Sequence, residues 1–287
     1  MRYAEPMPDP DVDAALIAAY RARGLVTDAG ESVHLPTACP RASACWASED
    51  SARLPAVGSL AAALSPAYVG ARFAEGRLAV VLENLRNYGG WDLGPEAKIG
   101  MRYLAGAARA GFAEGHRVLF RGGGYAGTST WYRATTYAAH WLAAPPLASV
   151  DPSPTDLVDA LDRIAILQHV KCSPLGGRSE QSASMWRECG PHVLAHELGV
   201  LQPARVVVAG LSDNAGAVRA RIFPERVRVL GAETVRVGRK RLRIELEERV
   251  APWGVVQLLF VPHPATPGGT ARSLVAAARE MFAATAT

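Results

Sequence analysis

The chain has 287 residues, of which 49% are hydrophobic and 20% are charged, and its formal net charge is +4. This composition is typical of a packed globular protein and excludes an intrinsically disordered chain. The small positive excess is compatible with a phosphate-bearing partner but does not require one. No run of about eighteen apolar residues occurs, and residues 1–24 contain acids and prolines where a secretion signal has an apolar core. We therefore expect a cytoplasmic protein without membrane contact.

Four short apolar runs that end in polar or turn residues predict buried strands, at residues 77–84, 163–172, 204–213 and 254–264. Helix-like patterns separate them. This alternation predicts an α/β fold in which the strands pair in parallel through right-handed crossovers.

The remaining segments predict how the chain is organised around these strands. Residues 225–248 alternate apolar and charged side chains, as a solvated hairpin does, and a helix is expected at 270–284. Because no internal repeat and no break in composition occurs, we expect one domain over residues 1–287. We also expect a monomer. The domain would include an N-terminal cysteine-bearing segment at 1–75 and a helical insertion at about 92–160.

Ligands of parallel α/β sheets bind at the carboxyl ends of the strands, so the residues at those ends are the first candidates for a site. After the first strand, Glu83 and Asn84 are candidates for holding a water molecule, and Tyr88 and Trp91 offer stacking surfaces. After the fourth strand, His263 stands between two prolines, where a neutral imidazole could donate a hydrogen bond to a developing oxyanion. The alternatives are a surface ion pair for Glu83 and a turn histidine without a role.

The chain contains four cysteines, two in an early segment and two around the turn after the second predicted strand. Cys39 and Cys45 have five residues between them, and Cys172 precedes Cys189 by seventeen positions. In a reducing compartment such cysteines are metal ligands or plain core residues more often than disulfides. Four thiolates with none left over suit a [4Fe–4S] cluster or a structural zinc, and scattered buried thiols are the third possibility.

The sequence also contains three patterns that are weaker indications of function. Residues 122–127, GGGYAG, match a dinucleotide-binding pattern, but a suitable helix and an acidic ribose partner do not follow. His192 and His196 share a helix face at zinc-pair spacing without the catalytic glutamate between them. The basic run at 236–243 is typical of a solvated sheet edge, and contact with DNA phosphates is its alternative.

Residues 169–191, HVKCSPLGGRSEQSASMWRECGP, resemble the segment VKCRPPGNR…C of the iron–sulfur uracil-DNA glycosylases of the family 4 type. The segment VPHPAT at 261–266 is similar to their terminal HPS motif, and an early cysteine pair precedes the first strand in that family too. The resemblance covers roughly residues 35–283. It implies a three-layer αβα sandwich with a central four-stranded parallel sheet, a [4Fe–4S] cluster bound by the four cysteines, and hydrolysis of the glycosidic bond of uracil in DNA.

The resemblance also implies roles for single residues. His263 falls on the histidine that stabilises the departing uracil anion. Glu83 falls on the acid of the family's GEAPG loop, whereas Asn84 coincides with the asparagine of the GMNPG loop in the single-strand-selective branch of the superfamily. Gln168 stands where the family has an asparagine that reads the uracil edge, and Trp91 or Tyr88 would stack on the flipped base.

The sequence departs from the family pattern at the catalytic loop, at Gln168 and in the spacing of the early cysteines. Three functions therefore stay open. The first is a DNA glycosylase that acts on uracil or a related base. The second is an enzyme on the same scaffold that acts on a free nucleoside, nucleotide or other metabolite. The third is a non-catalytic cluster protein that binds nucleic acid.

Overall fold

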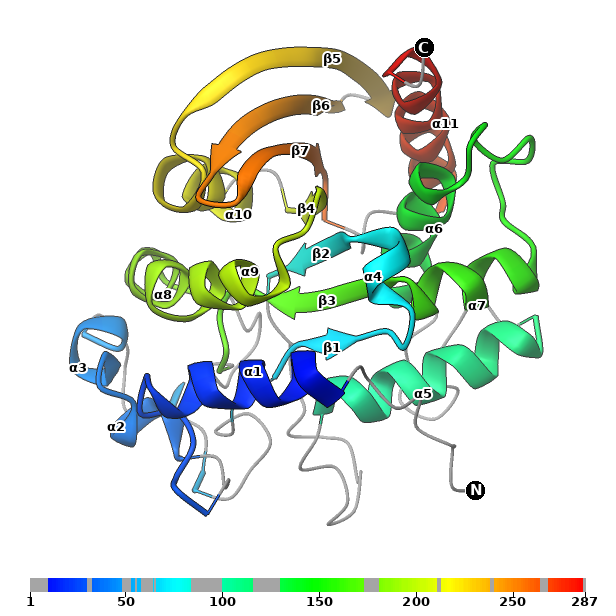
Figure 1. The fold of residues 1–287 in the computed structure, drawn as a ribbon. Helices are drawn as coiled ribbons and strands as arrows, with labels where there is room; N and C mark the ends of the chain where they lie inside the picture. The colour runs from blue at the N-terminus through cyan, green and yellow to red at the C-terminus, as the bar shows by residue number, and fades with distance from the viewer. Residues whose placement is uncertain are drawn as a thin grey trace.

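The computed structural model describes residues 10–29, 33–47, 53–54, 56–57, 64, 66–83, 100–115, 130–172, 181–210, 213–237, 240–263 and 268–285. Within these ranges the chain folds around one mixed sheet with helices on both of its faces (Figure 1). The predicted α/β class is confirmed.

The sheet has seven strands in the order β1-β3-β2-β4-β7-β6-β5. Their bounds are β1 Tyr68–Val69, β2 Leu78–Leu82, β3 Ile164–Gln168, β4 Arg205–Ala209, β5 Arg226–Val237, β6 Lys240–Ala251 and β7 Gly254–Val261. The pairs β3–β2, β2–β4 and β4–β7 are parallel, and the pairs that involve β1, β5 and β6 are antiparallel. The four runs that predicted strands contain β2, β3, β4 and β7.

The prediction of a four-stranded sheet is therefore incomplete, because the sheet has seven strands. The predicted hairpin at 225–248 is not a separate ribbon, because β6 pairs with β7 along seven residue pairs and so extends the sheet. The short strand β1 adds to the opposite edge through two pairs with β3. A strand of two residues carries too little periodicity to be found from the sequence.

Two clusters of buried side chains cover the two faces of the sheet. Successive strand residues point to opposite faces, so Ala79 and Val81 enter one cluster and Leu78, Val80 and Leu82 the other. Strand β2 is buried at each of its five positions, which explains why it reads as a continuous apolar run.

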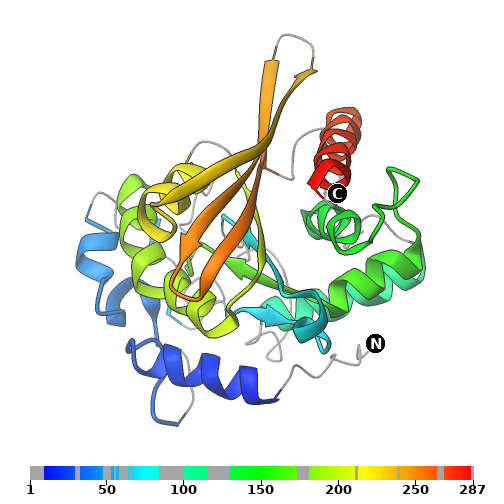
Figure 2. The ribbon, with the colours of Figure 1, turned by 45° about the horizontal axis from the view of Figure 1, so that its top comes forward.

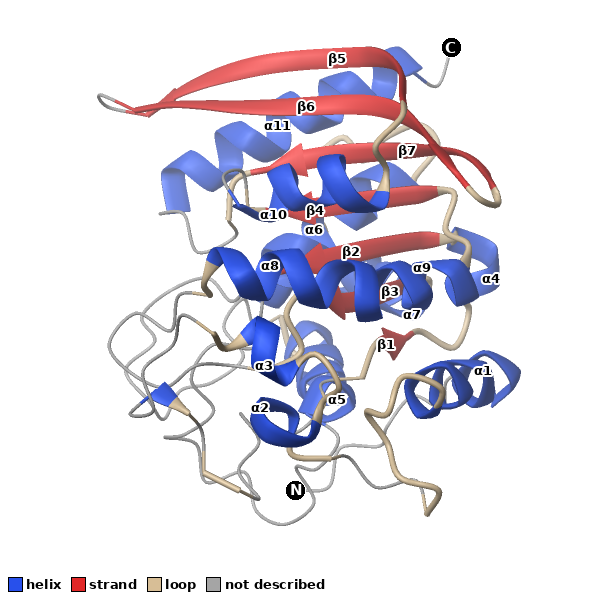
Figure 3. Ribbon diagram, turned by 90° about the vertical axis from the view of Figure 1, so that its left-hand side faces the viewer, coloured by secondary structure: helices blue, strands red, loops and turns tan. Residues whose placement is uncertain are grey.

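The helices on the first face follow β3 and β4 or come from the N-terminus (Figures 1 and 3). They are α1 Pro10–Arg21, α2 Leu35–Ala38, α3 Ala42–Cys45, α8 Ala183–Cys189, the π-helical turn η5 Gly190–Leu194, α9 Ala195–Leu201, α10 Asp213–Ala217 and the π-helical turn η6 Val218–Ile222. We call this face of the sheet the α10 face.

The opposite face, which we call the α6 face, is covered by longer helices. They are α5 Gly100–Ala113, α6 Thr130–Leu142, α7 Pro154–Asp162 and α11 Gly268–Thr285, and the short helix α4 Phe73–Gly76 leads into β2. Helix α7 begins at a capping box, in which Ser153 and Asp156 bind each other's backbone N–H groups and Pro154 occupies the first turn.

Among the described residues, no helix combines the length and the apolar character needed to cross a membrane.

Candidate functional site

The carboxyl ends of β2, β3, β4 and β7 lie at one edge of the sheet, which is the edge toward which their arrowheads point in Figure 3. We call it the C-terminal edge. The described residues that follow these strand ends are Glu83 after β2, His169 after β3, Gly210 after β4 and His263 near the end of β7. The site-forming positions of a parallel α/β sheet are thus occupied by an acid, two imidazoles and a glycine.

Glu83 and His263 come together across β4. The Nε2 atom of His263 lies 3.6 Å from Oε2 of Glu83, and the side chains are 28% and 14% exposed. The imidazole and the carboxylate are therefore close enough to act on one substrate while both stay open to solvent. Two residues that are 180 positions apart in the chain meet because β2 and β7 are both neighbours of β4.

Gly210 makes room for this pair. Its φ is +114°, and a Cβ atom at this position would lie 2.5 Å from Oε1 of Glu83 and 3.2 Å from Cβ of Asn214. Its backbone N–H donates to the carbonyl of Val261 at 2.9 Å. Only glycine combines this backbone conformation with the free space that the Glu83 carboxylate occupies.

Gln168 is the last residue of β3 and is 1% exposed. It pairs in register with Leu82 of β2. Alternation along the strand places Gln168 on the α6 face with Ile166, whereas Glu83 lies beside Gly210 and Asn214 on the α10 face. Gln168, which is predicted to recognise the uracil edge, thus lies at the C-terminal edge of the sheet. Its side chain, however, is on the opposite face of the sheet from that of Glu83.

A buried network that the sequence did not reveal supports the strand ends. The side-chain oxygen of Asn214 accepts a hydrogen bond from Nδ1 of His169 at 2.8 Å, and its nitrogen donates to the carbonyls of Val81 and Ala209. Because the amide nitrogen faces two carbonyls, the amide oxygen must face the imidazole, and the proton of His169 sits on Nδ1. Asn214 therefore ties the ends of β2 and β4 to the residue after β3.

The same imidazole contacts the helix that carries Cys189. Nε2 of His169 lies 3.3 Å from the carbonyl of Trp186, and the two rings meet edge to face at 4.7 Å. A Cβ atom on Gly190 would lie 2.4 Å from Nε2 of His169. The glycine after Cys189 therefore permits the close approach of helix α8 to the end of β3.

Burial lowers the pKa of His169 to about 4, against the hydrogen bonds with Asn214 and Trp186 and with a small contribution from the charge of Lys171. The folded protein thus keeps this ring neutral at a pH where the unfolded chain binds a proton. We expect the free energy of unfolding to fall as the pH falls from about 6.5 toward 4, by roughly 1.4 kcal/mol for each pH unit. Urea denaturation at pH 7.5 and pH 5 measures it, and His169→Gln should remove most of the difference between the two. An equal pH dependence in the variant would contradict the assignment.

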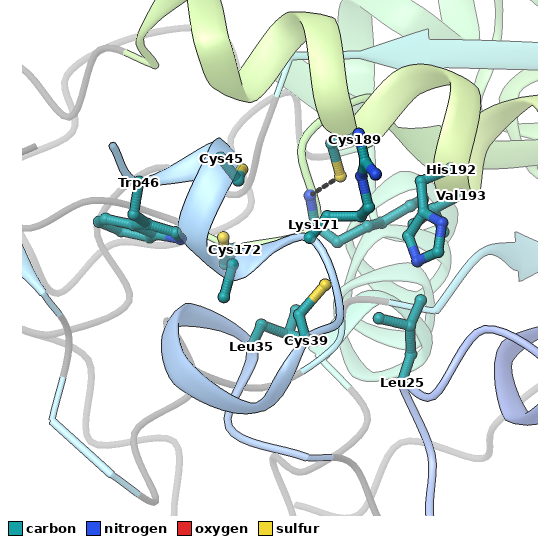
Figure 4. A pocket seen from close by; sticks show the side chains of 12 residues that line it. Leu25, Leu35, Cys39, Cys45, Trp46, Lys171, Cys172, Cys189, His192 and Val193 are labelled. Carbon is teal, nitrogen blue, oxygen red and sulfur yellow. Dashed lines mark hydrogen bonds between the residues drawn. The ribbon is translucent and has the colours of Figure 1, made fainter. Parts of the chain in front are cut away.

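All four cysteines line one cavity, together with Leu25, Leu35, Arg41, Ala42, Trp46, Lys171, His192 and Val193. Figure 4 shows their sulfur atoms directed toward a common space. Cys39 follows α2, Cys45 ends α3, Cys172 follows β3 and Cys189 ends α8. None of them forms a disulfide. The early and the late pair, more than a hundred residues apart, thus line the same cavity, and their binding of one metal centre stays a prediction.

The cavity raises the pKa of its thiols. Burial raises the pKa of Cys172 well above its usual value, and the neighbouring Cys189, Cys45 and Cys39 raise it further. Burial raises the pKa of Cys189 to about 12, against the backbone N–H of Lys171, which donates to its sulfur at 3.4 Å. Four adjacent thiolates would repel one another. A positively charged metal centre between them would offset this repulsion and favour the thiolate form, which is the form that binds metal.

A buried ion pair forms the wall behind this cavity. Nζ of Lys171 lies 2.5 Å from Oε2 of Glu197, and the two side chains are 2% and 1% exposed. The hydroxyl of Tyr20 donates to the other carboxylate oxygen and accepts the backbone N–H of Ala67. These bonds join α1, α9 and the end of β3, and they hold Lys171 and its neighbour Cys172 in place.

The structure describes the remaining sequence candidates only in part. His192 lines the cysteine cavity, and His196 lies within hydrogen-bond distance of the Arg23 guanidinium. Among the described residues, no group of three or more His, Cys, Asp or Glu side chains is arranged around a single metal ion. Asn84, Tyr88, Trp91 and the segment 122–127 lie outside the described residues.

A comparison with protein-family models finds no family that matches this chain. A comparison with curated proteins likewise finds no match.

Proposed function

We propose that the protein is a DNA glycosylase that hydrolyses the N-glycosidic bond of uracil or of a related modified base. The observation that carries the proposal is the meeting of Glu83 and His263, 3.6 Å apart, at the C-terminal edge of the sheet. A carboxylate can hold the water and face the sugar cation, and an imidazole can donate a hydrogen bond to the leaving base.

The fold supports the proposal at a coarser level. Strands β3, β2, β4 and β7 pair in parallel, and helices cover both faces of the sheet. This arrangement agrees with the three-layer sandwich that the sequence resemblance implies. It supports the scaffold and leaves the substrate to be tested.

The proposed reaction begins with a nucleotide that is flipped out of the base stack into the site. As the glycosidic bond breaks, the sugar gains positive charge and the base gains negative charge. His263 would donate a hydrogen bond to the base oxygen, which helps only while that charge develops. Glu83 would hold the attacking water and face the sugar cation. The water oxygen bonds to the sugar carbon while one water proton passes to the Glu83 carboxylate. The base leaves as an anion with the electrons of the broken bond and takes up a proton after its release.

We further propose that the four cysteines bind an iron–sulfur cluster. Cys39, Cys45, Cys172 and Cys189 would hold one [4Fe–4S] cluster, because each of its irons takes one thiolate and these four thiols line one cavity. The cluster would act as a structural cross-link between the N-terminal segment and the turn after β3. Reduced thiols of this kind suit a cytoplasmic protein. Structural zinc is the alternative.

Removing one ligand tests the cluster. We expect as-purified protein to be brown and to contain about four iron atoms and four sulfide ions per chain. Cys172→Ala should lose iron and sulfide together and lower the free energy of unfolding by at least about 3 kcal/mol, since metal binding contributes to folding. Val193→Ala, which alters the same cavity without touching a ligand, should keep its iron. Colourless wild-type protein with one zinc per chain would contradict the cluster.

One observation favours a second candidate, an enzyme that acts on a free nucleoside or another small metabolite. Gln168, which would recognise the edge of uracil, is almost fully buried and lies on the α6 face, the opposite side of the sheet from Glu83. The specific recognition of uracil is therefore the step of the proposal with the least structural support. Release of base from oligonucleotides that contain uracil, hypoxanthine or xanthine, beside the free deoxynucleosides, separates the two. Faster release from the free deoxynucleosides would replace the proposal by this candidate.

A further inference from the structure

The ribbon formed by β5 and β6 extends beyond the C-terminal edge of the sheet (Figure 2). The last residue of β6 that pairs with β7 is Glu245, opposite Phe260. Five further cross-strand pairs of β5 and β6 lie past that level, and the outer four run from Thr234↔Arg243 to Val237↔Lys240. We call residues 234–237 and 240–243 the arm. Its four residues per strand span about 14 Å, and it extends on the edge where Glu83 and His263 lie.

The two faces of the arm differ in chemistry. Val235 and Leu242 pack against the buried cluster on the α6 face. Alternation places Arg236, Arg241 and Arg243 on the other face, and all three are exposed. That face continues along β6 into Glu245 and Glu247, which bind Arg219 on the α10 side of the sheet. The arginines of the arm and Glu83 are thus on the same side of the sheet, at the same edge.

Charge pairing changes where the ribbon leaves the body of the protein. Along the body, Arg228 pairs with Glu248, and Arg249 pairs with Glu247. In the arm, Arg243 pairs with Glu245 at the base, whereas Arg236 stands directly opposite Arg241 and neither of these two has an ion pair among the described residues. Like charges on facing residues destabilise a strand pair. If these arginines served only to prevent the sheet edge from pairing with another chain, they would not need to face each other. An anion bound between Arg236 and Arg241 would remove the repulsion between them.

We propose that the arm binds the phosphate backbone of nucleic acid beside the nucleotide held at Glu83 and His263. The choice of nucleic acid over another polyanion rests on the proposed function, because the arm adjoins a site proposed to act on DNA. The span of about 14 Å corresponds to roughly four nucleotides of a duplex strand, so the arm would contact phosphates within that distance on one side of the target.

Two double variants with equal changes of charge test the arm. Arg236→Ala with Arg241→Ala removes its facing arginines. Arg221→Ala with Arg226→Ala removes two exposed arginines away from the arm, and Arg226 also faces an arginine, Arg249, at the other end of β5. The readout is the affinity for undamaged oligonucleotides, measured by fluorescence anisotropy over a series of salt concentrations, which requires no catalysis.

We expect the arm variant to bind about tenfold more weakly at low salt and to lower the slope of log affinity against log salt by roughly two, one for each lost phosphate contact. The control variant should bind like the wild type. The difference should shrink as the undamaged oligonucleotide is shortened toward about four nucleotides, the length that the arm spans. Equal affinities of the two variants would overturn the proposal, as would displacement of DNA by polyglutamate at equal charge concentration. Arm-dependent binding without base release would uphold the arm and reject the glycosylase.

Discussion

Replacement of His263 by alanine should lower the single-turnover rate of base release by about 100- to 1,000-fold, which is the usual cost of removing one donor to a developing oxyanion. The fold should survive, because the side chain is 28% exposed and lies at the end of a strand. Substrate affinity should change little, since the hydrogen bond strengthens only as the charge develops. The assay is release of labelled base, with the thermal midpoint measured beside it.

A matched pair of variants makes this result specific. His34→Ala alters another histidine, which bonds to Thr37 near α2 and lies far along the chain from the strand ends, and it should keep full activity. Glu83→Gln should also lose most activity, because the amide keeps the shape of the side chain and removes its charge. Unchanged turnover in His263→Ala would remove the imidazole from the mechanism, whatever Glu83→Gln does.

Gly210→Ala should lose both stability and activity. A Cβ atom at this position would meet the Glu83 carboxylate at 2.5 Å, and the backbone φ of +114° is strained for any residue with a side chain. The strain costs about 1–3 kcal/mol of folding free energy. The carboxylate must also move, and a misplacement on the order of 1 Å costs roughly 100-fold in rate.

Gly254→Ala separates these two effects. Gly254 has a φ of +128°, but no heavy atom lies within 4 Å of the position where its Cβ would stand. It should therefore lose stability by a similar amount and keep the wild-type rate at a temperature where both variants are folded. Equal activities of the two variants would show that the position of Glu83 does not depend on Gly210. Denaturation and single-turnover rates on the same preparations supply the comparison.

The parts of this molecule that could be predicted from sequence are those with a strong local signal. The strands inside the runs at 77–84 and 204–213 are apolar at all positions except Arg205, because they are covered on both faces. The cysteines stand out because the chain has only four of them, and His263 stands out because it follows a buried strand. The meeting of Glu83 and His263 follows from parallel pairing, which brings the strand ends to one edge.

What the sequence did not reveal depends on contacts between distant residues. His169 and Asn214 are 45 positions apart, and nothing in the local sequence around either residue indicates that their side chains form a hydrogen bond. Gly210 and Gly190 look like ordinary turn glycines until the atoms they accommodate, on Glu83 and His169, are known. The arm was visible as a basic run, but its place beside the site follows only from the register of β6 against β7.

In the proposed reaction, a nucleotide lies between Glu83 and His263, and water cleaves its glycosidic bond. The most direct test of this reaction is incubation of the wild-type protein with a uracil-containing oligonucleotide, followed by chromatography and mass spectrometry of the products. The account predicts free uracil in equal amount to abasic strand, and neither product from the Glu83→Gln, His263→Ala double variant. Intact uracil-containing strand after incubation with brown, fully folded wild-type protein, or equal release by the double variant, would contradict it.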